Sequence, residues 1–169
     1  MLIVAAILAG LGQAVLAQDN PKSGAAEKQT DSAQATAQKP KLSQDQLEAN
    51  FKATLTKALF KGRWCSVKDG QLGPEKEDKY SIRSVTKIGA DMWLINARVQ
   101  YGKNDFVAPI PVQVKWAGDT PVITLDKVAV AGSGEYSARV VIYEKTYAGT
   151  WSAGDHAGLL SGVIAVDKE

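Results

Sequence analysis

Cysteine and histidine are almost missing from this sequence, which has a single residue of each among 169. One cysteine cannot form an internal disulfide, a CxxC redox pair or a thiolate metal cluster, and one histidine excludes a His-rich metal site. The same scarcity removes most nucleophile–base sets. We therefore expect no metal, no cofactor and no enzyme activity.

An excess of charge of one sign is also missing, because 20 Lys and Arg stand against 18 Asp and Glu, for a net charge of +2. Proteins that bind nucleic acids or anionic membranes usually carry clustered basic residues. We therefore expect no nucleic-acid partner and no electrostatic binding to a membrane surface.

The first 17 residues carry no charge and are largely apolar. This stretch is short for a membrane span, which needs about 20 apolar residues, and it ends in Val15-Leu16-Ala17. The pattern predicts a signal peptide over residues 1–17, cleaved before Gln18, so that the mature protein is exported, periplasmic or secreted, without a stable membrane anchor. An uncleaved anchor is the alternative interpretation.

Residues 18–41 contain no Val, Ile, Leu, Met or aromatic residue. Such a segment cannot bury enough apolar surface to offset the entropy lost on ordering. We expect a disordered linker over residues 18–42. All the Trp, Tyr and Phe residues follow it, so the folded domain is expected at 43–169.

The domain begins with signals typical of a helix. Ser43 and Gln46 have the spacing of a capping box, and Gly62 is a typical C-terminal stop. These signals predict a helix over 44–61. Its apolar stripe recurs every four residues, at Leu47, Phe51, Leu55 and Leu59. The opposite face carries both signs of charge, which favours docking within the molecule over binding to a membrane or a partner.

After Gly62 the hydrophobic period changes to two, and short turn signals recur. Connections this short join antiparallel neighbours. The pattern predicts eight strands, at 63–67, 80–88, 92–101, 107–116, 122–130, 136–144, 147–152 and 157–166. We expect a mainly β fold, an eight-stranded antiparallel up-and-down β-barrel preceded by one amphipathic helix, because closure removes exposed strand edges.

Two further features refine the strand assignment. Pro109 and Pro111 interrupt the ladder of their strand and indicate an edge or a bend. The mixed charge run at 75–79 lies in the longest connection, and we expect its side chains to be solvated.

The tripeptide Gly62-Arg63-Trp64 at the start of the first strand resembles the Gly-x-Trp signature of the calycin group, the lipocalins and their relatives. The resemblance implies a lipocalin-like barrel whose Trp packs across the closed end, covered by a basic side chain from near the last strand, where Lys168 stands. We expect Trp64 to be buried beside the helix. Residues 147–151 with 154–156 are also similar to uncharacterised exported bacterial proteins, which implies no known activity.

Other conspicuous residues have plain structural interpretations. Cys65 is expected to be a buried small side chain rather than a reactive thiol. Asp155 and His156 are expected in a surface turn, since no second His or Cys accompanies them. Residues 132–134 lack the strand-to-helix context of a phosphate loop, and we expect a hairpin turn there.

A barrel of eight strands either fills itself with side chains or holds one small ligand. We expect an exported barrel that binds a hydrophobic or amphipathic small molecule, because Ala97, Ala138 and Gly149 leave room among large residues. The alternative is a non-catalytic interaction or envelope-associated module with a filled barrel or curved sheet. The predicted ligand-binding residues are Trp93, Ile95, Tyr101, Val112, Val114, Tyr136, Val140, Tyr147 and Trp151.

Overall fold

The computed structural model describes residues 40–130 and 134–167. The predicted signal peptide, nearly all of the predicted linker and Lys168 lie outside the described residues. Of the turn predicted at 132–134, only Gly134 is described, at the start of a strand.

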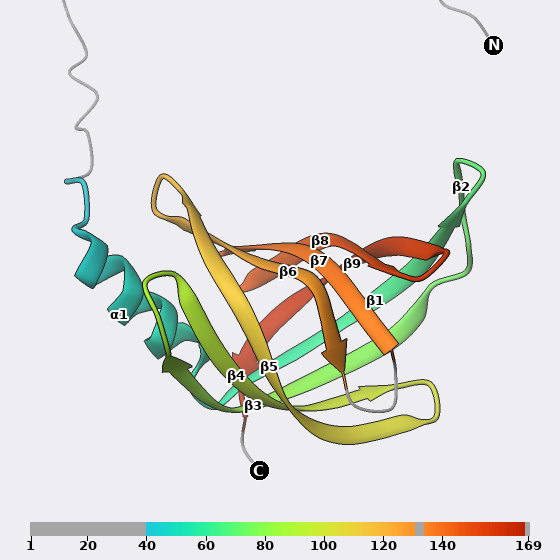
Figure 1. Cartoon of the computed structure of the whole chain (residues 1–169), viewed down its shortest axis with the longest axis horizontal. Helices are drawn as coiled ribbons and strands as arrows, with labels where there is room; N and C mark the ends of the chain where they lie inside the picture. The colour runs from blue at the N-terminus through green and yellow to red at the C-terminus, as the bar shows by residue number, and fades with distance from the viewer. Residues whose placement is uncertain (1–39, 131–133, 168–169) are drawn as a thin grey trace, which may run out of the picture. The chain divides into compact units, whose positions relative to one another are not determined.

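The described chain forms one helix followed by nine strands (Figure 1). These elements are α1 (Gln44–Leu55), β1 (Ala58–Lys68), β2 (Gln71–Leu72), β3 (Lys76–Lys87), β4 (Met92–Tyr101), β5 (Asn104–Ala117), β6 (Thr120–Val130), β7 (Gly134–Tyr143), β8 (Thr146–Ala153) and β9 (His156–Val166).

Strand β1 closes the sheet into a barrel. Each strand from β3 to β8 pairs antiparallel with its successor, and β1 pairs with β3 on one side and with β9 on the other. The β1–β9 seam runs from Ala58↔Val166 to Val67↔Ala157. The predicted eight-stranded antiparallel barrel is therefore confirmed. The two-residue strand β2, which pairs with the end of β1, was not predicted.

The start of α1 is where the sequence predicts it. The Ser43 hydroxyl accepts a hydrogen bond from the backbone N–H of Gln46, and the Gln46 side chain accepts one from the backbone N–H of Ser43. This reciprocal capping box satisfies two N–H groups that the first helical turn leaves without partners. Within the described residues, no helix combines the length and the apolar character that crossing a membrane requires.

The predicted end of the helix is wrong. The helix stops at Leu55 rather than at residue 61, because Thr56 adopts an extended conformation and Lys57 has a positive φ of 55°. From Ala58 onward the chain is a strand, in which Leu59 pairs with both β3 and β9. Pairing on both sides outweighs the local helical pattern, which carries less than about 1 kcal/mol per residue.

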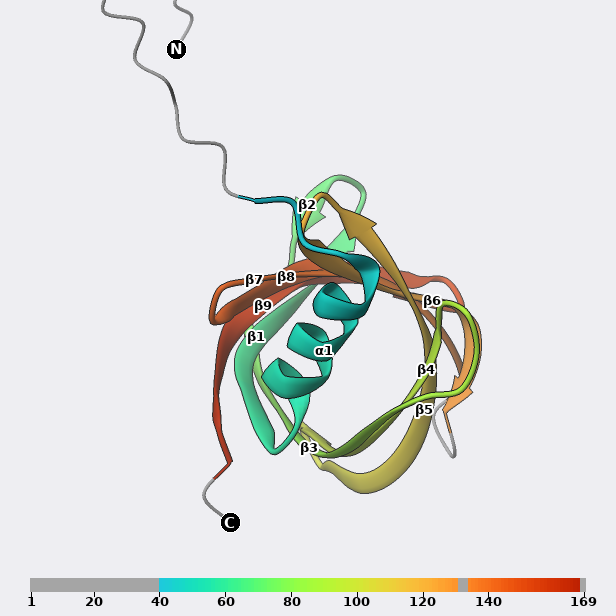
Figure 2. The ribbon, with the colours of Figure 1, turned by 90° about the vertical axis from the view of Figure 1, so that its left-hand side faces the viewer.

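Helix α1 lies across one end of the barrel (Figure 2). The Phe51 ring meets the rings of Trp93 and Trp116 edge-on, at centroid distances of 5.1 Å and 6.3 Å. Glu48 forms an ion pair of 2.6 Å with Lys87 at the end of β3. The apolar stripe of α1 therefore docks within the molecule, on the end of the barrel where β3 ends and β4 begins.

The barrel wall is only partly paired between β5 and β6. Their ladder stops at Gln113, so the first nine residues of β5 pair with β4 alone. The backbone N–H of Val114 donates to the Asp91 carbonyl on the β4 side. Since N–H directions alternate along a strand, the nitrogens of Pro109 and Pro111 face away from β4. The two prolines therefore remove no hydrogen bond there, and of the predicted edge or bend the structure shows a local edge.

Candidate functional site

The two ends of the barrel differ in chemistry. We call the end opposite α1 the far end; β1 finishes there, and β8 turns into β9 (Figure 1). Five of the nine predicted ligand-binding residues lie in the buried apolar core: Trp93, Ile95, Val112, Val114 and Tyr147. Tyr101 and Val140 pack against this core. The other two, Tyr136 and Trp151, lie towards the far end, near the start of β7 and the end of β8.

The far end contains a buried carboxylate. Asp78 is only 5% exposed and pairs with Gly62 of β1 and Tyr101 of β4. The hydroxyls of Tyr80 and Tyr147 donate hydrogen bonds to its two carboxylate oxygens, each at 3.1 Å. The prediction that the whole run 75–79 is solvated is therefore wrong at Asp78.

The physical reason is the period of β3. Asp78, Tyr80 and Ile82 occupy alternate positions of this strand and share its inward face. Extending the apolar alternation of the strand backwards from Ile82 would have found Asp78. The prediction that Asp78 lies in a solvated loop used only the charges of the run at 75–79.

Burial controls the titration of this cluster. Desolvation raises the pKa of Asp78 above its usual value, while the hydrogen bonds from Tyr80 and Tyr147 act in the opposite direction. Desolvation, followed by the nearby carboxylate, also raises the pKa of Tyr80 and of Tyr147. Both phenols therefore stay protonated at neutral pH and keep their hydrogens for the Asp78 oxygens.

Glycines make room for the large side chains of β8. A Cβ atom on Gly62 would lie 2.1 Å from the Tyr147 hydroxyl oxygen, and one on Gly162 would lie 2.7 Å from the Tyr147 ring. A Cβ on Gly158 would lie 2.6 Å from the indole nitrogen of Trp151. The sequence interpretation of Gly62 as a helix stop missed this role, which needs the β1–β9 register to be seen.

Trp64 lies at the far end rather than beside the helix, so that prediction is wrong. Its ring meets Trp151 edge-on, with centroids 5.5 Å apart, whereas the helix residue Phe51 contacts other tryptophans. The ammonium of Lys76 lies over the Trp64 ring, 4.8 Å from its centroid. A basic side chain does cover the Trp, but it comes from β3; Lys168 lies outside the described residues.

Two hydrogen-bond donors at the far end are buried without partners. The indole nitrogens of Trp64 and Trp151 are shielded from solvent, and no acceptor lies within reach among the described residues. Leaving a buried donor unpaired costs about 1–3 kcal/mol, so folded proteins usually provide an acceptor.

The interior near this end also contains a second tyrosine contact. The hydroxyl oxygens of Tyr101 and Tyr136 lie 3.5 Å apart, and Phe106 of β5 packs edge-on against Tyr101. This contact joins β4 to β7 across the interior, beside the stretch where β5 and β6 are not paired with each other.

An open groove of about 1160 Å³ reaches the same region from outside. It is lined by β1, β3, the end of β4, the β4–β5 turn and β9, and its lining residues include Gly62, Asp78, Tyr101 and Gly162. On the inner side of the wall, Tyr147 fills the space beside Gly62 and Gly162.

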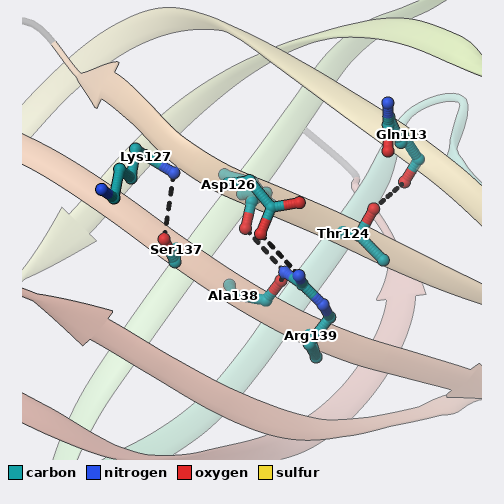
Figure 3. Close-up of polar contacts among 8 residues, drawn as sticks. Gln113, Thr124, Asp126, Lys127, Ser137, Ala138 and Arg139 are labelled. Carbon is teal, nitrogen blue, oxygen red and sulfur yellow. Dashed lines mark hydrogen bonds and ion pairs between the residues drawn. The ribbon is translucent and has the colours of Figure 1, made fainter.

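Other polar contacts have structural explanations. Arg139 of β7 donates to the Leu125 carbonyl at 2.7 Å and pairs with Asp126 at 2.5 Å, where the β6–β7 register shifts (Figure 3). The backbone N–H of Lys127, whose φ is positive, donates to the Ser137 hydroxyl. These bonds hold a β-bulge on the outer surface.

The remaining conspicuous residues, Cys65, Asp155 and His156, have plain structural roles. Cys65 is buried, as predicted. His156 lies 3.3 Å from Asp155 in the exposed β8–β9 turn. In the part of the chain that the structure describes, no cluster of three or more His, Cys, Asp or Glu residues is arranged to hold a metal ion.

Comparisons of the chain with protein-family models, with curated protein sequences and with solved structures gave no match. The closed antiparallel barrel is consistent with a calycin-like architecture. An architecture of this kind does not determine a function, which depends on the residues of the site.

Proposed function

We propose that this protein binds a small amphipathic molecule in the far end of its barrel. The observation that carries the proposal is the pair of buried, unpartnered indole N–H groups of Trp64 and Trp151. A ligand oxygen between them would supply the missing acceptor. Sites for small molecules are typically apolar, with a few such polar groups to orient the ligand.

The surroundings suit an amphipathic ligand. The apolar residues that pack around the barrel core, such as Leu160 and Val140, would contact its hydrocarbon part. The tyrosines and Asp78 would contact its polar part. At the helix-covered end, by contrast, the rings of Phe51, Trp93 and Trp116 pack against one another between α1 and the barrel.

The partly paired wall between β5 and β6 supports the entry of a ligand into the barrel. Residues 104–112 of β5, which precede Gln113, form no ladder with β6. Separating β5 from β6 along this stretch therefore breaks no backbone hydrogen bonds between the two strands. The inward side chain of Phe106 lies on this stretch. We infer that a ligand enters by displacement of side chains here rather than by opening of a paired strand.

The proposal extends to lineage and location. We infer a lipocalin-like mode of binding from the Gly-x-Trp tripeptide at 62–64 and the closed barrel. We also infer that the binding form is exported, because of the charge-free apolar leader at 1–17.

The test uses N-phenyl-1-naphthylamine, an uncharged probe that fluoresces in apolar surroundings. We expect saturable, equimolar binding to the wild-type protein. Ala138 faces Trp151 across β7 and β8, so Ala138→Leu places three extra carbons at the far end and is expected to weaken binding at least about tenfold.

Ala148→Leu is the matched control, since Ala148 lies on the exposed outer face of β8. Circular dichroism establishes that both variants are folded. Absence of saturable binding, or equal binding by both variants, contradicts the proposal.

A second candidate function is association with another protein through the outer face of β7, β8 and β9. The observation that favours it is a group of exposed apolar side chains on β7 and β9, the two strands that flank β8. Their exposed fractions are 42% for Val141, 60% for Tyr143, 41% for Leu159 and 53% for Val163. This interaction-module function is the one to pursue if the probe does not bind.

A further inference from the structure

Among the residues that the structure describes, the buried carboxylate of Asp78 has neutral partners only. The described residues supply the hydroxyls of Tyr80 and Tyr147 and the backbone N–H of Asp78 itself. No Lys or Arg of the described chain forms an ion pair with it. Buried charges in proteins are usually paired with an opposite charge or a metal, so Asp78 is an exception that requires a reason.

The two phenol bonds are also long for a carboxylate. Each measures 3.1 Å, whereas hydrogen bonds from a hydroxyl to an ionised oxygen are typically about 2.5–2.7 Å. An ionised carboxylate has about four acceptor positions, of which the phenols use two and the backbone N–H of Asp78 uses a third. Asp78 therefore keeps the capacity to accept a further, stronger donor.

Aromatic rings surround this position. Tyr80 and Tyr147 donate to Asp78, and Tyr101 is its neighbour on β4. The faces of such rings attract cations. The ammonium of Lys76 over the Trp64 ring is an example of this contact at the same end.

We propose that the ligand of the far end carries an ammonium group, which pairs with Asp78. This inference rests on the binding function proposed above and specifies the ligand class as an amphipathic amine. The ammonium contacts the Asp78 oxygens and the surrounding rings, and the hydrocarbon part lies in the apolar interior.

The ammonium group reaches the carboxylate by the route between β5 and β6 proposed above. Phe106 on this stretch packs against Tyr101, which is the β4 neighbour of Asp78. The outer groove is lined by charges of both signs, for example Lys79 and Glu77. Among the described residues Asp78 is the one charged side chain that is buried, and we infer that this carboxylate selects the charge of the ligand.

Competition with the fluorescent probe tests the inference. Dodecylamine, 1-dodecanol and dodecanoate share one chain length and differ in the charge of the head group. All are used below their aggregation limits at neutral pH. We expect dodecylamine to displace the probe at least about tenfold more strongly than dodecanol, with dodecanoate the weakest.

Asp78→Asn removes the charge and keeps the shape of the side chain. We expect it to abolish the preference for the amine while binding of dodecanol persists. Asp91→Asn is the matched control, because Asp91 lies outside the barrel and pairs with Lys115. It is expected to keep the preference.

Tyr147→Phe provides an independent variant if Asp78→Asn does not fold. It removes one phenol that competes for the carboxylate, so the preference for the amine is expected to rise. An unchanged or smaller preference in this variant overturns the inference.

The two proposals fail in different ways. Equal displacement by dodecylamine and dodecanol, or strongest displacement by dodecanoate, overturns the amine inference and leaves the binding function standing. If neither the naphthylamine probe nor any dodecyl compound binds, the binding function itself is wrong.

Discussion

At the scale of single residues, the packing of the far end depends on glycines, which have no side chain. The Tyr147 hydroxyl reaches Asp78 because Gly62 and Gly162 leave space for its ring, and the Trp151 indole lies over Gly158 in the same way. A methyl group at any of these glycines would overlap a neighbouring atom. These positions are therefore determined by packing in the sheet.

Asp78 gives a prediction for the pH dependence of stability. Burial raises its pKa in the folded protein above the unfolded value near 3.8. The folded state then binds more protons than the unfolded state, so its stability falls as pH rises through this range. We expect the free energy of unfolding of the wild type, minus that of Asp78→Asn, to decrease from about pH 4 towards neutral pH.

Urea denaturation at several pH values measures this difference, and Asp91→Asn is a control of opposite sign. The Lys115 ammonium lowers the pKa of Asp91, so its contribution is present above the usual Asp range and is lost as pH falls. A wild-type minus Asp78→Asn difference that rises with pH would show that Asp78 is not desolvated in the folded state.

At the scale of elements, the boundary between α1 and β1 shows where sequence patterns stop being informative. Leu59 continues the four-residue stripe of Leu47, Phe51 and Leu55, and it is buried as that stripe requires. It is buried in a strand, however, because β3 and β9 both pair with it. Local periodicity predicted the burial of Leu59 but could not reveal partners more than 20 residues away.

The partly paired strand β5 gives a second prediction. The N–H groups of Ala108 and Ile110 face β4, since they share the phase of Val114, while the N–H of Val107 faces the side where the β6 ladder is missing. We expect the Val107 amide to exchange with deuterium at least about tenfold faster than the Ala108 amide.

Hydrogen exchange followed by NMR resolves the two amides individually. The N–H of Lys115 has the same phase as that of Val107 but lies where β5 and β6 are paired, so it is the internal control. Protection of Val107 equal to that of Lys115 would mean that the free side of β5 pairs with another segment.

At the scale of the whole molecule, the sequence predicted the architecture better than the site. Short turns and period-two alternation are local, so the strand at 92–101 matches β4 at both ends. The polar far end depends on register between distant strands, which brings Gly62, Asp78 and Tyr147 together. No local pattern contains that information, and a charged residue in a charged run was assigned to solvent.

Closure of the barrel can be tested with the native cysteine. Cys65 of β1 is opposite Leu159 of β9. The backbone N–H of Asp167 donates to the carbonyl of Lys57, so the odd-numbered residues of β1 form the hydrogen-bonded pairs with β9, and Cys65 is one of them. Cα atoms of such pairs lie about 5.5 Å apart, within the range of disulfides. We expect Leu159→Cys to form a disulfide with Cys65 on oxidation.

The disulfide would join the first and last strands of the barrel and close a loop of about 95 residues. In the chain-entropy account, a loop of this length stabilises the folded state by about 4–5 kcal/mol. Mass spectrometry detects the loss of two hydrogens, and urea denaturation compares the oxidised with the reduced variant. Leu159→Ser is the control without a thiol. If Leu159→Cys forms no disulfide in the folded protein, or if its oxidised form is not more stable than its reduced form, β1 and β9 do not meet in this register and the barrel is not closed as described.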